Sequence, residues 1–563
     1  MPRPPNLLPL RVTLLALLCV PVLLTAGAQR SSLAEALATI RTGHLHARMA
    51  FLADDLLEGR APGTRGGALA SRYIASEMQR IGLRPAAPGY LQPVTLVGTR
   101  LDTTRAFLRA GARRTPGSVR FELGQEAVIW RGGEATPTTV EAPLVFVGYG
   151  VHAPEYAWDD FEDYDVRGKV LLALVNDPPA PPAEPDRFEG RALTYYGRWT
   201  YKLEEARRRG AVGVLLVHTP GAAGYDWSVV RNSWSGERFF LPRDTALPAP
   251  LALEGWLSGP AARRLLRAAD LDLGELFVRA ARRDFRPVET SLTIQAALPG
   301  RLRRVQSANV AGLLPGSDSL LMRETVVYMA HWDHLGIGPA VGGDSIYNGA
   351  YDNASGVALL LEIAEAFAVL EPAPARSILF LATTAEEAGL LGSEAYLRAP
   401  LRSLRGTVAA LNVDGANLWG ETEDLMVLGG TWSTLGGSAA VRARGQGLRL
   451  TFDRAPGLGL AFRSDHFPFA RAGVPALGIG HGLEYRGRPT GWGERQLLRY
   501  DSAAYHQPGD EYDPGWDLRG AVQQGRLAFL LGWDVATTAE RPAWDPDAPF
   551  RRPPAPTRPP PGR

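Results

Sequence analysis

The sequence contains a single cysteine, Cys19, in a chain of 563 residues. Cleavage of an N-terminal segment that includes Cys19 would leave no thiol, which excludes disulfides and cysteine nucleophiles from the mature chain. The sequence also lacks an excess of one charge, because its formal net charge is only +2. Two arginines in the first 28 residues and a net +3 in residues 541–563 leave the remainder near −3. A basic face is therefore not expected, and we predict no nucleic-acid partner.

Motifs of several other protein classes are missing as well. The sequence has no G-x-x-x-x-G-K-[ST] and no G-x-G-x-x-G linked to a strand, so nucleotide binding has no support. Its serine-containing loops do not resemble a nucleophile elbow. Beyond the first segment, no apolar run is long enough to span a bilayer.

The N-terminal segment has the pattern of an export signal. Arg3 and Arg11 precede an apolar stretch at 12–24, and the small residues at 25–28 follow in an A-x-A arrangement. A membrane anchor is the alternative, but the short apolar run and the small residues favour cleavage after Ala28. We therefore predict a periplasmic or secreted protein with no stable membrane anchor after cleavage.

Residues beyond about 300 alternate between buried strands and amphipathic helices. The pattern predicts strands at 324–330, 377–385, 406–415, 423–429 and 473–480, and helices at 356–371, 389–398 and 517–538. This alternation predicts an α/β fold with a mixed, mostly parallel sheet flanked by helices. At the other end, residues 31–85 are typical of two helices joined by a loop.

The middle of the chain has a different sequence pattern. Apolar β-rich runs at 143–151 and 168–175 precede a helix and a buried strand within 204–218. The segments 176–188 and 220–250, rich in Pro, Gly, Asp and Trp, are predicted to be long surface loops. Together these runs resemble the protease-associated (PA) domain, a β-rich module often inserted into exported peptidases.

Polar side chains come directly after three of the predicted strands, where open α/β sheets place their active sites. They are His331 and Asp333, then Glu386 and Glu387, and then Asp414. Two further loops contribute Asp352 with Asn353, and Tyr505 with His506. Adjacent carboxylates such as Glu386 and Glu387 repel each other unless cations or protons offset the charge, although they could also cap the following helix.

Nitrogen and carboxylate donors without thiolates suit zinc, with cobalt or manganese as possible substitutes. Five such ligands with one shared carboxylate can hold two ions about 3.5–4 Å apart. The order of the motifs resembles peptidase family M28. The motifs are H-x-D at 331–333, D-N-A-S-G at 352–356, E-E-x-G-L-x-G-S at 386–393, N-x-D-G at 412–415 and Y-H-x-P-x-D at 505–510. The match covers about 300–535 and the helices at 31–85.

The resemblance implies a role for each of these residues. His331 and Asp414 would bind one zinc ion, Glu387 and His506 the other, and Asp352 would bridge them. Further implied roles are Glu386 as general base, Asp333 as the carboxylate that orients His331, and Tyr505 as a donor to the oxyanion. For Tyr505, simple packing is the alternative. The resemblance also implies a cis peptide bond between Asp352 and Asn353.

The implied protein is an exported di-zinc aminopeptidase that acts on peptides through a metal-bridging hydroxide. The alternatives are a carboxypeptidase-like hydrolase, for which Arg463 could bind a terminal carboxylate, a glutaminyl cyclase, or a non-catalytic binding relative. The sequence leaves the oligomeric state open. The predicted organisation is a signal peptide at 1–28, the N-terminal part of the peptidase domain at 29–130, a PA-like insert at 131–296, the catalytic domain at 297–540 and a disordered Pro/Arg-rich tail at 541–563.

Overall fold

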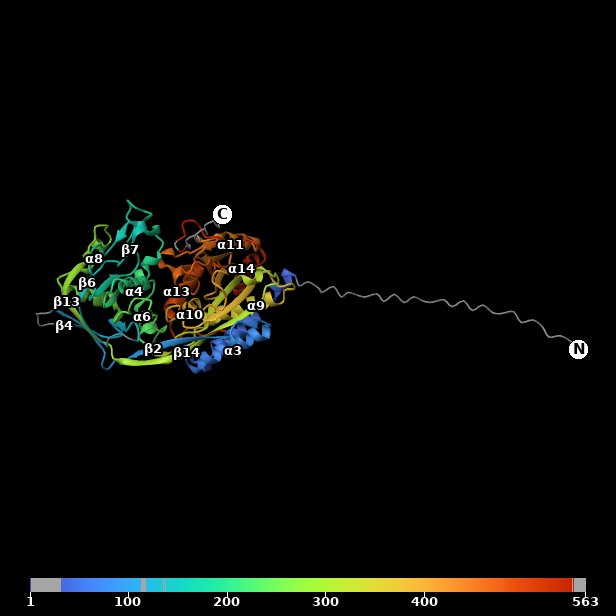
Figure 1. Ribbon diagram of the computed structural model, residues 1–563, viewed down its shortest axis with the longest axis horizontal. Coiled ribbons are helices and arrows are strands. Elements are labelled where there is room, and N and C mark those ends of the chain that lie inside the picture. Colours follow the sequence, from blue (N-terminus) through green and yellow to red (C-terminus); the bar gives the residue numbers. More distant parts are fainter. Residues whose placement is uncertain (2–31, 113–117, 135, 137, 549, 551–563) are drawn as a thin grey trace, which may run out of the picture.

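The computed structural model describes Met1 and residues 32–112, 118–134, 136, 138–548 and 550. The predicted signal peptide, apart from Met1, lies outside these residues. Figure 1 shows two units side by side, each built around its own sheet. None of the helices in the described part of the chain is long and apolar enough to cross a membrane.

The larger sheet has ten strands within the described residues, in the order β11-β2-β14-β18-β15-β19-β22-β20-β21, with β1 paired to β14. Their bounds are β1 Arg84–Pro85, β2 Leu91–Leu101, β11 Arg238–Phe240, β14 Gly300–Leu314, β15 Thr325–His331, β18 Ser377–Thr383, β19 Thr407–Asn412, β20 Asp424–Leu428, β21 Arg449–Phe452 and β22 Ala476–His481. The central strands β18, β15, β19 and β22 run parallel, as do β20 and β21, whereas the other pairs are antiparallel. The predicted α/β class and mixed sheet are confirmed. The sheet is not mostly parallel, because among the described residues only four of its nine strand pairings are parallel and these lie mainly at the centre.

Helices cover both faces of this sheet. Along β15, Val326, Tyr328 and Ala330 join one apolar core, and Val327 and Met329 join another, because side chains alternate along a strand. The first core is shared with α1 (Leu33–Thr39), α2 (Thr42–Leu52), α3 (Arg65–Ile81), α9 (Gly356–Ala368) and α14 (Arg519–Thr537); the second is shared with α10 (Leu391–Arg398) and α12 (His466–Arg471). The prediction of two helices in 31–85 was wrong, because the extended backbone at Ile40 divides the first of them into α1 and α2.

The second sheet has eight strands among the described residues, in the order β4-β3-β13-β6-β9-β10-β12-β5. Their bounds are β3 Phe107–Ala112, β4 Ser118–Phe121, β5 Ala127–Trp130, β6 Thr139–Phe146, β9 Val170–Leu174, β10 Gly213–His218, β12 Leu253–Ser258 and β13 Val288–Ala297. The sheet thus spans 107–297, which we call the insert. The predicted boundary at 131 is too late, because β3 and β5 pair with the distant strands β13 and β12. That the insert is a PA domain stays a prediction.

The segment 220–250 is not only the surface loop that its composition predicts. It contains α6 (Trp227–Trp234) and β11, and β11 pairs with β2 of the larger sheet. Trp234 stacks on Trp256 with ring centroids 5.8 Å apart, and the indole of Trp227 donates to the backbone carbonyl of Gly124. This segment therefore joins the insert to the larger sheet.

The predicted tail begins later than residue 541. Arg541 forms an ion pair with Glu324 at 2.5 Å, and the Trp544 indole donates to the carbonyl of Gly473. The ring of Phe550 packs against Phe467 at 5.4 Å between centroids. Residues 551–563 lie outside the described part.

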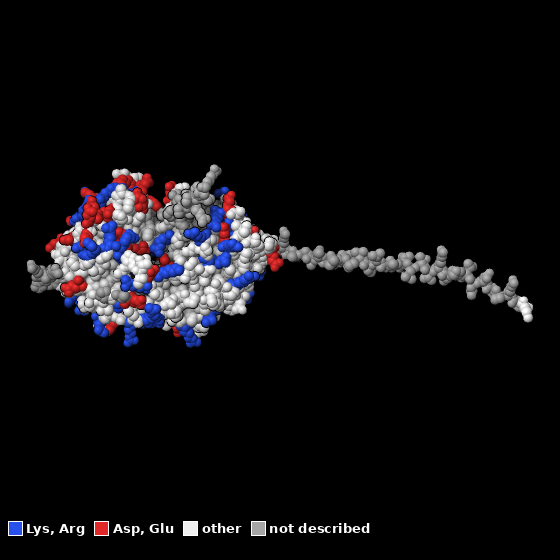
Figure 2. All heavy atoms as spheres, in the orientation of Figure 1, with Lys and Arg blue, Asp and Glu red and all other residues white. Residues whose placement is uncertain are grey.

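On the face drawn in Figure 2, acidic and basic side chains are interspersed, in line with the small net charge.

Candidate metal centre and active site

Three neighbouring parallel strands bring the predicted site residues to one edge of the larger sheet. β15 ends at His331, β18 ends shortly before Glu386 and Glu387, and β19 ends shortly before Asp414. Because β18, β15 and β19 are adjacent and parallel, their carboxyl ends lie together. His331 and Asp414, 83 positions apart in sequence, thereby meet, and the backbone N–H of Glu386 donates to the carboxylate of Asp333, 53 positions earlier.

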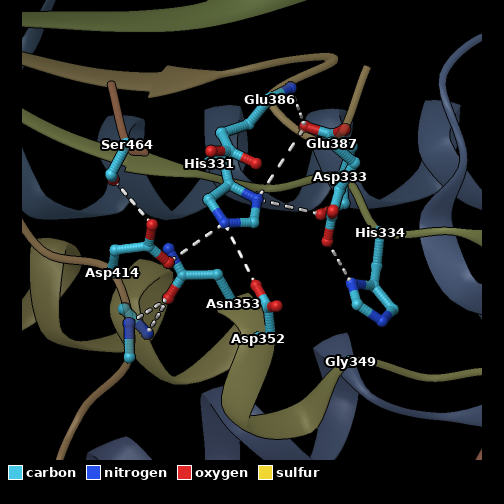
Figure 3. Close-up of polar contacts among 12 residues, drawn as sticks. His331, Asp333, His334, Gly349, Asp352, Asn353, Glu386, Glu387, Asp414 and Ser464 are labelled. Atoms are coloured by element: carbon cyan, nitrogen blue, oxygen red, sulfur yellow. Dashed lines mark hydrogen bonds and ion pairs between the residues drawn. The ribbon is translucent and has the colours of Figure 1, made fainter. Parts of the chain in front are cut away.

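His331 lies between two carboxylates (Figure 3). Its Nε2 is 3.2 Å from Oδ1 of Asp352 and 3.2 Å from Oδ1 of Asp414. The other oxygen of Asp414 accepts a hydrogen bond from the Ser464 hydroxyl at 2.6 Å, and Asn412 donates to that hydroxyl. Ser464 therefore holds the orientation of Asp414, a contact that the sequence motifs did not indicate.

Asp352 connects His331 and Asp414 to a second group, which contains His506 and Glu387. Its Oδ2 is 3.4 Å from Nε2 of His506, and the same nitrogen is 3.3 Å from Oε2 of Glu387. One oxygen of Asp352 thus faces each histidine, as a bridging ligand requires. The five predicted ligands lie together in the structure, and their binding of metal stays a prediction.

The donor set fits zinc. Two groups of three residues share Asp352 and could each hold an ion: His331, Asp352 and Asp414, and His334, Asp352 and Glu387. Their donors are imidazole nitrogens and carboxylate oxygens without sulfur. Carboxylates clustered this closely repel one another unless cations compensate them, which favours bound cations here.

His334 belongs to this cluster although the sequence did not give it a role. It is 1 % exposed, and its Nδ1 is 2.7 Å from Oε1 of Glu387. Its ring lies edge-on to that of His506, with centroids 5.7 Å apart. The two histidines therefore face Glu387 together. The position of His334 in H-W-D-H, three residues after His331, was the only available signal.

Burial and charge shift the pKa values at the site in different directions. Burial raises the pKa of the Glu386 carboxyl well above its usual value, and the charges of Asp414 and Glu387 raise it further against the opposing effect of His331. Burial alone would raise the pKa of Asp352, but hydrogen bonds from His331 and His506 lower it well below normal. In the metal-free protein Asp352 therefore carries charge, whereas Glu386 readily holds a proton.

Asp333 contacts both His331 and the loop of Glu386. Nδ1 of His331 is 3.1 Å from the backbone carbonyl of Asp333 and 4.0 Å from its carboxylate. The carboxylate instead accepts the backbone N–H of Glu386 at 3.1 Å. Asp333 therefore orients His331 through its main chain and fixes the loop that carries Glu386 through its side chain.

The peptide bond between Asp352 and Asn353 is cis, which confirms that prediction. The Asn353 side chain accepts from the N–H groups of Gly356 and Gly415 and donates to the carbonyl of Val413, so it ties this loop to the one that carries Asp414. Asp510 accepts the backbone N–H of Asp352 at 3.0 Å. The last aspartate of the Y-H-x-P-x-D motif thus positions the shared carboxylate.

Arg60 ties the N-terminal helices to the site. Its guanidinium donates to four backbone carbonyls, those of Leu52, Trp332, Asn348 and Gly349. Trp332 follows His331, and Gly349 precedes the loop of Asp352, so one side chain fixes both loops. Burial lowers the pKa of Arg60 to about 10 against the opposing charges of Asp510 and the other site carboxylates, which leaves it cationic at neutral pH.

We expect Arg60→Met to lower the free energy of unfolding of the metal-free protein by at least ~3 kcal/mol, because each carbonyl left buried without a donor costs about 1–3 kcal/mol. Chemical denaturation measures the change. Arg72→Met is the matched control: Arg72 is exposed on α3, and its replacement should stay within about 0.5 kcal/mol. A loss below 1 kcal/mol for Arg60→Met would contradict this account of the loops.

Tyr505 lies beside the ligands. Its ring centroid is 4.0 Å from that of His506. Burial raises the pKa of its hydroxyl well above normal, and the charges of Asp352 and Glu387 add to this, so the group stays protonated. None of the described residues accepts or donates a hydrogen bond at this hydroxyl. It is therefore free to donate to a ligand.

A second cluster of the same residue types serves another purpose. His44, Glu362 and Glu365 lie close enough together to hold an ion. Arg48, however, already pairs with Glu362 and Glu365 and also with Glu77. The cation that these carboxylates need is thus a side chain, and the cluster links α2 to α9.

The model of peptidase family M28 matches residues 309–530, which contain every predicted metal ligand. These residues form an M28 peptidase domain. The family resemblance of the motifs is thereby confirmed.

Two curated relatives contain similar sequence. Aminopeptidase NAALADL1 of Rattus norvegicus is 28 % identical over 327 residues, which are 50 % of this chain and 39 % of the rat protein. Aminopeptidase NAALADL1 of Mus musculus is 34 % identical over 126 residues, covering 22 % of this chain and 15 % of the mouse protein. The matches thus span well under half of each relative's length.

A solved aminopeptidase from Aneurinibacillus sp. strain AM-1 has the same overall fold. The superposition covers 92 % of this chain and all of that one, with a TM-score of 0.52 and 18 % sequence identity. Because the coverage extends over nearly the whole chain, the fold likeness includes the insert as well as the M28 domain.

Proposed function

We propose that this protein is an exported di-zinc aminopeptidase that removes N-terminal residues from peptides. The observation that carries the proposal is the position of Asp352, which faces His331 with one carboxylate oxygen and His506 with the other, at 3.2 and 3.4 Å. The M28 domain and the aminopeptidase names of the relatives support the assignment. The export signal stays a sequence-based prediction.

The residues divide into ligands and groups that act on substrate. His331 and Asp414 would hold one zinc ion, His506 and Glu387 the other, and Asp352 both. Zinc bound there would polarise the peptide carbonyl and bring the pKa of a bound water towards neutrality. His334 is a further candidate ligand beside Glu387.

Glu386 is the general base of the proposed reaction. It takes a proton from the attacking water and later gives it to the leaving amine, so it must hold and release a proton near neutral pH. Its raised pKa suits the first half of that exchange, and bound cations would lower it towards the working range. Tyr505 donates its unpaired hydroxyl to the developing oxyanion.

The direction of the exopeptidase follows from the charge of the site. The carboxylates that line the site can pair with a free α-amino group, which a blocked substrate lacks. We therefore expect N-acetylation of a good aminoacyl substrate to lower kcat/KM at least tenfold, about 1.4 kcal/mol of transition-state stabilisation. The measurement compares free and N-acetylated chromogenic amides, each with and without a chelator.

The same panel separates the alternatives. Equal, chelator-sensitive hydrolysis of free and blocked substrates would reject the aminopeptidase and retain a zinc hydrolase. Preference for peptides with a free C-terminal carboxylate would indicate the carboxypeptidase-like alternative, and conversion of N-terminal glutamine without hydrolysis would indicate the cyclase. Zinc binding without turnover of any substrate would indicate a non-catalytic relative.

A further inference from the structure

A helix of the insert reaches the proposed metal centre. α6 lies on the side of the insert that faces the M28 domain (Figure 1), and it contacts His506 twice. The Ser233 hydroxyl is 2.7 Å from Nδ1 of His506, and the Asn232 amide donates to the backbone carbonyl of His506 at 3.3 Å. The residue is thus held at both its ring and its main chain by a segment that lies more than 270 positions earlier in the chain.

The contact lies on the side of the ring that faces away from the carboxylates. Nε2 of His506 points towards Asp352 and Glu387, so Nδ1 is the nitrogen left for a partner outside the centre. An imidazole that binds a metal through Nε2 carries its proton on Nδ1, and that proton needs an acceptor in a buried site. His506 is 8 % exposed, and the Ser233 oxygen is the acceptor within reach.

We propose that Ser233 is a positioning residue through which the insert completes one half of the metal centre. This inference rests on the proposed di-zinc function. Ser233 accepts the Nδ1–H of His506 and so fixes both the tautomer and the plane of the ring. The insert is then part of the catalytic apparatus and more than an appended module.

The other half of the centre gives an internal comparison. The corresponding nitrogen of His331 is 3.1 Å from the backbone carbonyl of Asp333, which belongs to the M28 domain itself. The ring of His331, in the half with Asp414, is therefore oriented by the M28 domain itself. The ring of His506, in the half with Glu387, is oriented by a residue of the insert. Loss of Ser233 should weaken the binding of one zinc ion and leave the affinity for the other unchanged.

α6 is anchored firmly enough to hold such a contact. Val229 and Val230 are buried, and Trp234 stacks on Trp256 of β12. On the M28 side, Arg463 donates to the carbonyl of Ala223 just before the helix. The helix is therefore fixed from both units, which holds the serine oxygen in place against the ring.

The experiment measures zinc binding to the metal-free full-length protein in competition with a chromophoric chelator. For Ser233→Ala we expect one of two ions to bind about tenfold more weakly and the other to keep its wild-type affinity. Ser233→Thr retains a hydroxyl and should restore most of the affinity. Ser235→Ala, an exposed serine just beyond the same helix, is the control and should bind both ions as the wild type does.

Thermal unfolding of the metal-free variants shows whether the fold is intact, and equal midpoints for Ser233→Ala and Ser235→Ala are expected. Two ions bound with wild-type affinity in Ser233→Ala would overturn the role of Ser233 and leave the di-zinc function standing. Equally weakened binding of both ions would also overturn the role of Ser233, because the effect would not be specific to His506. A wild-type protein that binds fewer than two ions would overturn the di-zinc proposal together with this inference.

Discussion

Replacing Glu386 with glutamine is expected to lower kcat by about 10²–10⁴ while the zinc content stays at the wild-type level. Glutamine keeps the shape of the side chain but cannot take a proton from water. Because the carboxylate of Glu386 is not within ion-pair distance of either histidine, its loss should leave the ligands in place. Steady-state kinetics together with elemental analysis of the purified variant measure both quantities.

The structure supports a base at this position in two ways. The backbone N–H of Glu386 is fixed by the Asp333 carboxylate, so the side chain starts from a defined point at the end of β18. Its raised pKa shows an environment that favours a bound proton. Near-normal kcat in Glu386→Gln would remove it as the base. A variant that loses its zinc would make it a ligand instead.

The sequence predicted that three of the candidate ligands would lie together, because their positions depend on strand ends. An apolar run of six or seven residues followed by a polar residue fixes where a buried strand stops, and the parallel arrangement then gathers those ends. The sequence alone therefore groups His331, Glu387 and Asp414. The loops of Asp352 and His506 follow no predicted strand, so the sequence offered them as candidates only through their polar residues, and the family motifs then implied their roles.

Contacts made across the fold were not predictable in the same way. The hydrogen bonds of Arg60 and Ser464 join residues that no local pattern connects. The eight-residue helix α6 is too short, and too rich in tryptophan, to show a clear helical period, so its segment was predicted to be a loop. Its position depends on aromatic packing within the insert and on β11, which pairs with a strand of the other sheet.

The boundary of the insert also depends on contacts between residues far apart in the sequence. A run such as Ala127–Trp130 is apolar throughout and could belong to either sheet. Only its pairing with β12, more than 120 residues later, assigns it to the insert. Local hydrophobicity predicts that a strand exists, whereas long-range pairing decides its sheet.

Replacing Glu387 with glutamine should have a different effect from Glu386→Gln, although the two residues are adjacent. The Glu387 carboxylate is 3.3 Å from His506 and 2.7 Å from His334, so the substitution removes the charge of a proposed ligand. We expect about one zinc ion per chain to be lost at limiting metal, with kcat reduced and partly restored by added zinc. Glu386→Gln should show neither the loss of metal nor the rescue.

Metal titration of both variants beside the wild type decides between these roles and the alternative that the pair only caps the following helix. Helix capping predicts a loss of roughly 0.3–1 kcal/mol in stability for each variant with near-normal activity. The geometry argues against helix capping, because α10 begins only at Leu391 and both glutamates lie before its N-cap residue, Leu390. Full zinc occupancy with low activity in Glu387→Gln, together with zinc loss in Glu386→Gln, would reverse the two assignments. The rescue by zinc is the decisive measurement, since a base cannot be replaced by added metal, whereas a weakened ligand set can be saturated by it.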